Sequence, residues 1–521
     1  MKKKYFNSKI IYTTLLFLSS FFFNFYYGYI GVYPIDSFLI YNSGYNVLNG
    51  FHPFKDFWSV TGPLLDYIQF FFFFLFDVNW FSYVLHSSFI NFLIVIFSFY
   101  YFVKSGLQAS SAFIYSLSIS ILAYPLIGTP FVDNHAVIFA LISIGYLNLG
   151  IILKRDNFFN YSAIFITLSF LSKQIPSAYI LIVELLVILI YVFFANNKNF
   201  RPLINYLLSL VILLALILFF FFINNIPIKN FIIQYLFYPI SLGESRMTEV
   251  SFNINNTISQ LKFIYFSLFP IFLLIFILWK KKNKDNYIKK DLIVLTSTIL
   301  MSLLFIYSQI ITRNQVFIFF LIPFYLGLSH AYFLKYYNKK FILTLILVLL
   351  TVSTLKYHLR FNHDKKFMEL TGFNIKLAVN AKTIDAALSG LKWISSDYKN
   401  NPQEEIDLIN QTKRILKDDK SNKIYITDYQ FFQSITKNEK ISPNKWFDAM
   451  SIPKKDNKYS IYYKFFFLKS IKKQKIETIY IISRNREEIY SLDTIIDDKK
   501  CLVFDELNSM LVKLDLKNCR I

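Results

Sequence analysis

The chain has 521 residues, of which 55% are hydrophobic and 20% are aromatic, including 61 Phe and 37 Tyr. One soluble core does not need so much apolar mass, so the composition excludes an ordinary soluble enzyme and predicts a polytopic membrane protein. The net charge of +22 is spread over short loops and a mixed-charge tail rather than over one basic face, which argues against nucleic-acid binding.

Charge density divides the chain into two parts. Residues 1–357 hold 25 Lys+Arg and 11 Asp+Glu, whereas residues 358–521 hold 30 and 22. We therefore expect an all-α transmembrane domain over 1–357, followed by a small soluble α/β domain over 358–521. The two cysteines, Cys501 and Cys519, have no metal-ligand spacing and predict no disulfide framework.

Apolar runs predict about eleven transmembrane helices, because a bilayer core of about 30 Å takes about 20 apolar residues per helix. These runs lie near residues 10–31, 80–103, 107–124, 135–153, 158–172, 175–195, 203–223, 262–279, 291–311, 315–334 and 341–357. A polar loop, 32–67, follows the first of them. In it Phe38, Tyr41, Tyr45 and Leu48 recur at helical spacing, which predicts an amphipathic helix over 36–48 on the membrane interface.

The apolar segment 64–76 is short and contains Asp66, and the charge distribution decides whether it crosses the membrane. If it does not cross, one side receives 18 basic residues and the other receives six. The positive-inside rule then predicts a cytoplasmic N-terminus and an exterior soluble domain. We therefore expect 64–76 to be a second interfacial helix in the first exterior loop.

The soluble part shows the alternating pattern of an α/β domain. We expect a helix over 384–398, a strand over 423–429, a helix from Gln430 and a strand over 477–485. A further helix and a hairpin-like pair, 501–506 with 510–516, end the chain. No Gly-rich phosphate loop occurs, which argues against a nucleotide site.

Acidic residues of the first part gather on the predicted exterior side. Asp36 follows the first span, Asp56 lies in the same loop, and Asp133 precedes the fourth span. Carboxylates near hydrocarbon are costly unless they are paired, hydrated or bound to a cation. This clustering favours Asp36 and Asp133 as catalytic residues, with Asp36 as the base, or both as ligands of a divalent cation. Asp56 is a candidate for substrate binding. The structural alternatives are a helix cap for Asp36 and a solvated surface charge for Asp56.

Polar and basic residues at the same predicted mouth suit an anionic substrate. Lys173 and Gln174 interrupt apolar sequence there, and an ammonium in that place would pair with a phosphate. The alternative is a snorkelling lysine that caps a helix. Arg246 and Arg313, in later exterior loops, are candidates for further phosphate or sugar contacts.

The first exterior loop contains a series of short motifs, namely Asp36, Leu48 to Gly50, Pro53-Phe54, Asp56 to Trp58 and Pro63-Leu64. In these positions it resembles the first exterior loop of GT-C superfamily glycosyltransferases, especially the bacterial kind related to protein O-mannosyltransferases and the lipid A aminoarabinose transferase. The resemblance also takes in Asp133, Lys173-Gln174 and Thr312-Arg313, and so covers about residues 1–335. The chain departs from many relatives at Ser37, where they have Glu, and at Val60 to Pro63, where they have an acid or His before Pro-Pro.

The resemblance implies an integral-membrane enzyme that takes a sugar from a polyprenyl-phosphate donor with inversion, using the loop aspartate as base or metal ligand. The expected acceptor is a lipid-linked glycan or a protein, and the expected place is the exterior face of the inner (plasma) membrane. The two departures remove ligands that a metal site would use, so that Asp56 or Asp133 would have to substitute. Two other functions stay open: a polysaccharide or lipid transporter, and an exterior-face glycan polymerase or ligase.

Overall fold

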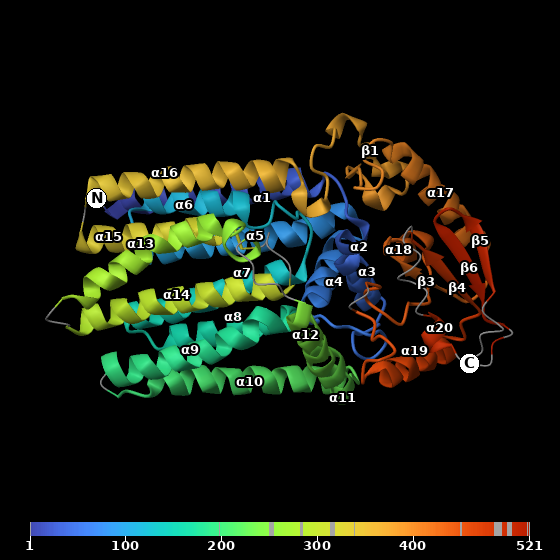
Figure 1. Cartoon of the computed structure of the whole chain (residues 1–521), viewed down its shortest axis with the longest axis horizontal. Coiled ribbons are helices and arrows are strands. Elements are labelled where there is room, and N and C mark those ends of the chain that lie inside the picture. Colours follow the sequence, from blue (N-terminus) through green and yellow to red (C-terminus); the bar gives the residue numbers. More distant parts are fainter. Residues whose placement is uncertain are drawn as a thin grey trace.

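The computed structural model describes the chain except residues 1, 197, 250–254, 282–284, 313–317, 338, 449–450, 484–491, 497–502, 518 and 520–521. For 2–8, 244–249, 255–256 and 493–494 it describes the backbone alone. Long helices lie side by side in a bundle, and a smaller α/β domain covers one end of that bundle (Figure 1).

Eleven helices lie where the sequence predicts membrane spans. They are α1 (Lys2–Gly28), α5 (Trp80–Lys104), α6 (Ala109–Leu122), α7 (Val132–Leu153), α8 (Asn157–Ser172), α9 (Gln174–Ala195), α10 (Arg201–Ile223), α13 (Lys262–Trp279), α14 (Asn286–Thr312), α15 (Leu321–Tyr336) and α16 (Lys340–Tyr357). Short helical segments join them or follow them: α11 (Ile228–Phe231), η1 (Ile232–Phe237), α12 (Tyr238–Glu249), η2 (Asn255–Ser259) and η3 (His358–His363).

Within the described residues, eight helical segments are long and apolar enough to cross a membrane. The helices α6, α8 and α15 fall outside this group, with 14, 16 and 16 residues. At about 1.5 Å per residue they reach about 21–24 Å, less than a hydrocarbon core of about 30 Å. Eight such segments are what a multi-pass membrane protein contains.

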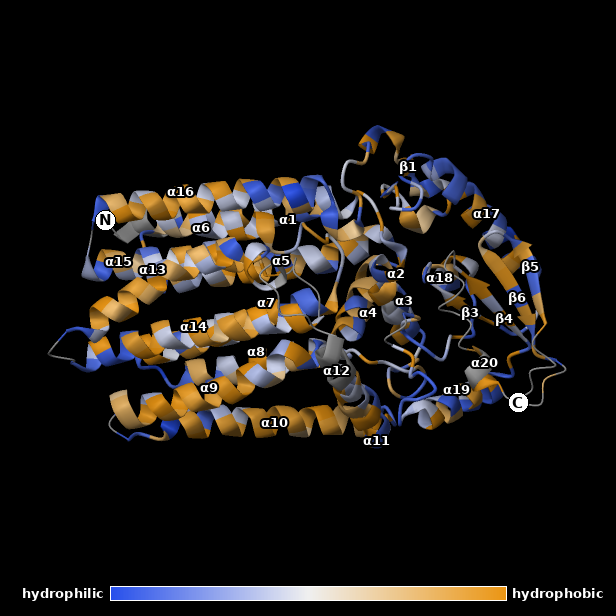
Figure 2. Cartoon of the chain, in the orientation of Figure 1, coloured by the Kyte–Doolittle hydropathy of each residue, from blue (hydrophilic) through white to orange (hydrophobic). Residues whose placement is uncertain are grey.

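Burial separates the helices at the centre of the bundle from those at its edge. In the apolar window of α7, 83% of the residues are buried, whereas in that of α10 only 11% are. The side chains of α10 are nevertheless strongly hydrophobic (Figure 2). An apolar helix without protein neighbours on most of its surface suits lipid as its surroundings.

The bundle has a basic end and an end that carries the soluble domain. The helices α9, α13 and α15 end, and α10, α14 and α16 begin, at the end away from that domain (Figure 1). The described residues there include the basic residues Arg201, Lys281 and Lys340. The helix α4 (Leu64–Phe76) has 13 residues and lies at the opposite end, next to the soluble domain (Figure 1). It therefore does not run the length of the bundle.

The first loop folds into two helices, α2 (Pro34–Ser37) and α3 (Leu39–Leu48), where one was predicted. The predicted apolar stripe exists, but its place differs from the prediction. Phe38 and Tyr41 are fully buried, and the ring of Phe38 lies 5.5 Å from that of Trp80 in the bundle and 4.7 Å from that of Phe431 in the soluble domain. Protein, not lipid, covers this part of the stripe, because the soluble domain packs on it.

The soluble domain contains a four-stranded sheet in the order β3-β4-β6-β5, in which β3 and β4 are parallel and the other pairs antiparallel. Its strands and helices are β3 (Lys423–Thr427), β4 (Thr478–Ile482), β5 (Phe504–Asn508), β6 (Leu511–Asp515), α17 (Pro402–Asp418), α18 (Phe432–Thr436), α19 (Ser460–Gln474) and α20 (Leu492–Ile495). All residues of β3 and β4 are buried, because alternate side chains face the clusters of α17 and of α19.

The predicted strands and the terminal hairpin are confirmed, and one predicted helix is wrong. In place of a helix over 384–398 the chain has the 3-10 turn η7 (Ala386–Leu388) and the strand β2 (Lys392–Trp393), which pairs with β1 (Val379–Asn380). Gly390, with φ +87°, turns the chain between the two. Other 3-10 turns are η4 (Lys366–Met368), η5 (Ile375–Leu377) and η6 (Ala381–Thr383).

A buried ion pair fixes the soluble domain to the first loop. Lys445 donates from Nζ to Asp66 Oδ1 at 2.7 Å, and the two side chains are 2% and 0% exposed. Two hydroxyl groups complete the cluster. Ser43 donates a hydrogen bond to Asp66 Oδ1, and Thr61 accepts one from Lys445 Nζ. Alongside it, Trp58 exchanges backbone hydrogen bonds of 2.8 and 2.9 Å with the 443–445 segment. The two domains therefore meet through a short strand-like contact with a charge pair inside it.

Replacing Lys445 with Ala should strongly weaken this contact, because it leaves the Asp66 carboxylate buried without its cation. A broken buried pair costs about 3–5 kcal/mol. The matched control is Lys473→Ala, because Lys473 also bridges to the first loop, at 3.2 Å from Asp56, but is 68% exposed and worth under about 1 kcal/mol. Thermal unfolding of the purified full chain measures both variants. Equal shifts of the melting temperature would contradict this interpretation.

Candidate active site

The candidate site lies where the bundle meets the soluble domain. Asp36 belongs to the short helix α2, Asp133 to the first turn of α7, and Lys173 to the junction between α8 and α9. In the sequence these residues are up to 137 positions apart, since 173 minus 36 is 137. The fold brings them to the same end of the bundle, as the predicted topology requires.

Asp133 and Lys173 form an ion pair. Lys173 Nζ lies 2.5 Å from Asp133 Oδ1, and the side chains are 21% and 8% exposed. Lys173 is extended, with φ −155° and ψ 144°, and ends α8 just before α9 begins. An ammonium has three donors, of which Asp133 uses one. The partial exposure and the remaining donors leave Lys173 able to bind a second anion.

The carboxyl group of Asp36 has a raised pKa. Burial, and after it the charges of Asp448 and Asp133, raise the pKa of Asp36. Lys173 opposes this rise, Asp428 adds a smaller one, and together these effects bring the pKa to about 7. A carboxyl group with this pKa is about half ionised at neutral pH, as a general base requires. The cap interpretation is wrong, because Tyr33 is the N-cap residue of α2 and no side chain caps that helix.

Two carboxylates of the soluble domain thus act on the candidate base, and the sequence analysis missed both. Asp428 directly follows β3, and Asp448 lies in the loop after the 443–445 contact. Nothing local in the sequence marks them, because they reach Asp36 only through the docking of one domain on the other. Their side chains have further interactions within the protein.

A chain of neutral hydrogen bonds holds the start of α7, where Asp133 lies. Tyr124 donates to His135 Nδ1, His135 Nε2 lies 3.0 Å from His86 Nε2, and His86 Nδ1 lies 2.9 Å from Gln69 Oε1. With the Gln69 oxygen as the acceptor, one tautomer of each imidazole satisfies the whole chain. His135 is thereby a structural link between α4, α5 and α7 rather than a metal ligand.

A close backbone contact sets the first loop against the α8–α9 junction. Gly62 N donates to Ser172 O at 3.1 Å, and a Cβ at Gly62 would lie 1.8 Å from Leu171 O. Only glycine fits there. Next to it, Gln174 Nε2 donates to Val60 O at 3.0 Å and to Tyr235 O. Gln174 therefore holds backbone in place beside Lys173.

The other predicted residues lie apart from this group or outside the described structure. Asp56 Oδ2 accepts the N–H of His52 at 3.0 Å, and Asp56 Oδ1 pairs with Lys473, so Asp56 stabilises its own loop. Arg246 belongs to α12, where the structure describes only its backbone. Arg313 lies outside the described residues.

The donor set does not suit a resident divalent cation. Among the described residues, no group of three or more His, Cys, Asp or Glu side chains is placed to hold a metal ion. Asp133 is paired with Lys173, and its neighbour His135 is committed to the hydrogen-bond chain. A metal shared by Asp36 and Asp133 would need ligands that these residues alone do not supply.

An apolar cavity of about 240 Å³ lies beside Lys173. Its wall combines α8, α9, α10 and α11. Phe170 and Leu171 come three and two residues before Lys173 in the chain, and Ser177 donates to the Lys173 carbonyl at 2.9 Å. On the far wall, Leu214 and Leu218 of α10 are exposed on the outer surface of the bundle. The cavity thus has the lipid-facing helix α10 on one side and the chain on either side of Lys173 on the other.

No family model matches the chain, and no curated protein does. The chain is similar to solved structures of the Archaeoglobus fulgidus oligosaccharyltransferase AglB. One, in complex with an inhibitory peptide and a dolichol-phosphate, has a TM-score of 0.48 and 10% identity over 92% of this chain and 70% of that chain. An acceptor-peptide complex has a TM-score of 0.46 and 12% identity over 91% and 69%. The apo form has 0.48 and 10% over 94% and 71%.

Proposed function

We propose that this chain is an integral-membrane glycosyltransferase that moves a sugar from a polyprenyl-phosphate donor to a lipid-linked glycan or protein acceptor. The observation that carries the proposal is the meeting of Asp36, with a pKa of about 7, and the Asp133–Lys173 pair beside an apolar cavity. A base, a phosphate-binding cation and a lipid groove are the parts that such a transfer needs.

The proposed step uses these parts together. The acceptor hydroxyl attacks the anomeric carbon of the donor, and the bond from that carbon to the phosphate oxygen breaks. Asp36 takes the proton of the hydroxyl, so the acceptor becomes a neutral glycoside. Lys173 binds the phosphate that leaves, and its fixed charge stabilises the negative charge that develops there. Asp133 holds the ammonium of Lys173 in place by the 2.5 Å contact.

The donor's lipid tail suits the cavity between α8 and α10. A polyprenyl chain must stay in an apolar medium while its sugar reaches water, and the cavity is apolar along nearly its whole wall. Its nearness to Lys173 would place the phosphate at the ammonium. No nucleotide-binding motif is then needed.

The exterior face of the inner (plasma) membrane is the proposed place of the reaction. The 18 basic residues on one side against six on the other favour it. Cys519, in the soluble domain, is disulfide-bonded, a bond that the sequence analysis did not predict. Disulfides persist in oxidising compartments, so this bond supports an exterior soluble domain.

Asp36→Asn should lower sugar transfer by about 10²–10⁴-fold with unchanged expression, because the amide cannot take a proton. In the unmodified protein the rate should rise with pH up to about 7 and level off above it, since the base acts in its ionised form. The control is Asp77→Asn, an exposed carboxylate beyond α4 whose φ of 62° asparagine tolerates. Mass analysis of envelope glycans gives the product. Retained transfer in Asp36→Asn would reject the role.

Ile217→Trp should raise the donor's KM, because the indole fills the apolar cavity that Ile217 lines. The control is Ile212→Trp on the same helix, since Ile212 is 52% exposed and is not part of the cavity wall. Kinetics with a polyprenyl-phosphate sugar measure both variants. An equal KM in the two would place the lipid elsewhere.

Reporter fusions after residues 104 and 357 test the sidedness. The fusion after Lys104 should report the cytoplasm and the fusion after Tyr357 the exterior, because α5 and α16 end at opposite ends of the bundle. The opposite pattern would reject the exterior assignment, and reports from one side by both fusions would reject the topology.

A further inference from the structure

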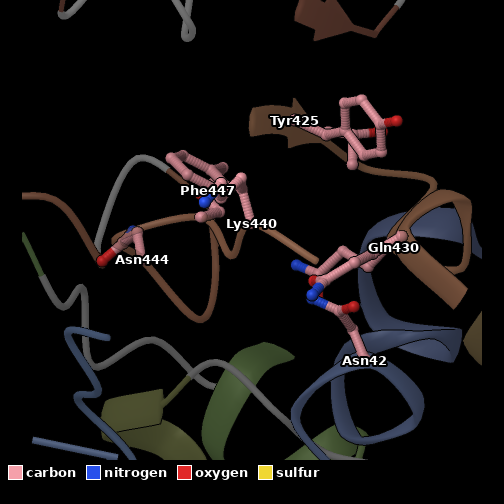
Figure 3. A pocket seen from close by; sticks show the side chains of 9 residues that line it. Asn42, Tyr425, Gln430, Lys440, Asn444 and Phe447 are labelled. Carbon is pink, nitrogen blue, oxygen red and sulfur yellow. The ribbon is translucent and has the colours of Figure 1, made fainter. Parts of the chain in front are cut away.

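The polar space between the first loop and the soluble domain is too small for a substrate (Figure 3). Asn42 of α3 and Gln430 of the soluble domain line it, and its room for a water-sized group is about 10 Å³. That volume takes about one water molecule, which suits buried amides such as these. This space is therefore part of the domain contact, and a different candidate for binding lies on the bundle itself.

A cluster of cations lies where α13 begins and α16 ends. Lys262 is the first residue of α13, and Lys356 belongs to the last turn of α16. Arg360, on η3, follows Lys356 by four residues, and Lys366 begins η4. Figure 1 shows that α16 ends on the side of the soluble domain. The four cations therefore lie at the edge of the bundle that faces this domain.

Aromatic rings join the two helices and support the cations. The ring centres of Phe263 and Tyr357 are 5.9 Å apart, so the start of α13 packs on the end of α16. Lys356 Nζ lies 4.4 Å from the centre of the Phe263 ring. The positive charges of Lys262 and Arg360 both act on the ammonium of Lys356. The cations thus form one group on a packed base and not a set of separate surface charges.

This group of cations has no acidic partner among the residues that the structure describes. Within 352–368, a segment that is described throughout, Asp364 is the one acid, and it bonds with His363 at 2.9 Å. Like charges that lie close together repel one another, and an anion placed between them removes that repulsion. The group is therefore suited to bind an anion from outside the protein.

The depth of the cations along the helices indicates which anion they meet. Lys356 follows Lys340, the first residue of α16, by sixteen residues, and Lys280 follows Lys262 by eighteen. At about 1.5 Å per residue these spacings are about 24 and 27 Å, whereas a hydrocarbon core is about 30 Å thick. Lys262 and Lys356 therefore lie where the acyl chains of a bilayer end and its phosphate groups begin.

Both helices present an exposed apolar stripe that leads to the cations. The residues of each stripe recur every three or four positions, which is the spacing of one helix face, and each is at least 36% exposed. On α16, which continues into η3, they are Phe341, Leu345, Val348, Val352, Leu355 and Leu359, and on α13 they are Phe266, Phe269, Leu273 and Phe276. Acyl chains that pack along these stripes would bring a lipid phosphate to the cations.

We propose that the start of α13 and the end of α16 bind the phosphate of an anionic phospholipid of the surrounding leaflet, through Lys262, Lys356 and Arg360. This site is distinct from the apolar cavity near Lys173, because Figure 1 shows α10 and α16 at opposite edges of the bundle. Its apolar residues are exposed to the leaflet and line no part of that cavity, which favours a phospholipid over the proposed donor. The inference does not depend on the proposed function.

Photolabelling of the full chain in phosphatidylcholine nanodiscs tests the site without requiring catalysis. The probes are phosphatidylglycerol and phosphatidylcholine, each with the same diazirine on an acyl chain near the headgroup. Mass spectrometry of the digested protein measures the label on each segment. The anionic probe should label 262–269 and 352–360 at least fivefold more than the neutral probe, because each nearby cation favours an anionic lipid by about fivefold.

Lys356→Gln combined with Arg360→Gln should lower the anionic label on these two segments by more than tenfold, because two cations are lost. Label at the Lys340 end of α16, in the same molecule, should stay unchanged. The matched control is Lys417→Gln, which removes an exposed lysine of α17 in the soluble domain and should change neither. If the double variant does not fold, Lys262→Gln, at an exposed position, should lower the label about fivefold.

Competition identifies the anion. Unlabelled phosphatidylglycerol should displace the anionic probe, and inorganic phosphate in the buffer should not. Equal labelling by the two probes, or undiminished anionic label in the double variant, would overturn the inference. Displacement by a polyprenyl phosphate but not by phosphatidylglycerol would assign the site to a polyprenyl carrier and overturn the phospholipid assignment. Displacement by inorganic phosphate would overturn the assignment to a lipid.

Discussion

The ion pair between Lys445 and Asp66 is the interaction on which the arrangement of the candidate site depends. Both side chains are almost completely buried, so neither charge has water as an alternative partner. The pair fixes the soluble domain on α4 and the first loop. Only in that position do Asp428 and Asp448 lie near Asp36. The membrane domain supplies the proposed base and the neighbouring cation, and the soluble domain supplies part of their surroundings.

Two neighbouring carboxylates have different environments, and this difference suggests different roles. Asp133 is neutralised by Lys173 at 2.5 Å and starts a helix whose position a chain of neutral side chains fixes. Asp36 lacks such a partner at hydrogen-bonding distance in the described structure. Burial and the nearby carboxylates raise its pKa to about 7, so that it can accept a proton near neutral pH. In the proposed reaction, Asp36 takes the proton and Asp133 holds the ammonium of Lys173 in place.

The sequence predicted those features that follow from local composition. The apolar runs predicted where the helices lie, and the charge count predicted that 64–76 does not cross the membrane. The resulting topology predicted that Asp36, Asp133 and Lys173 lie at the same end of the bundle. The sequence did not predict what domain docking creates. An apolar stripe such as Phe38 and Tyr41 has the same pattern whether lipid or protein covers it. Asp428 and Asp448 have no local pattern that marks them as part of a site. The wrong helix over 384–398 reflects apolar spacing that serves short turns around Gly390.

The position of the apolar cavity has a consequence for how substrate arrives. Its outer wall includes Leu214 and Leu218, which lie on the exposed surface of α10. A lipid-tailed molecule would thus enter sideways from the surrounding leaflet rather than from solution. Diffusion in two dimensions would then govern encounter, and the mole fraction of the carrier in the leaflet, not its amount per volume of buffer, would set the degree of saturation.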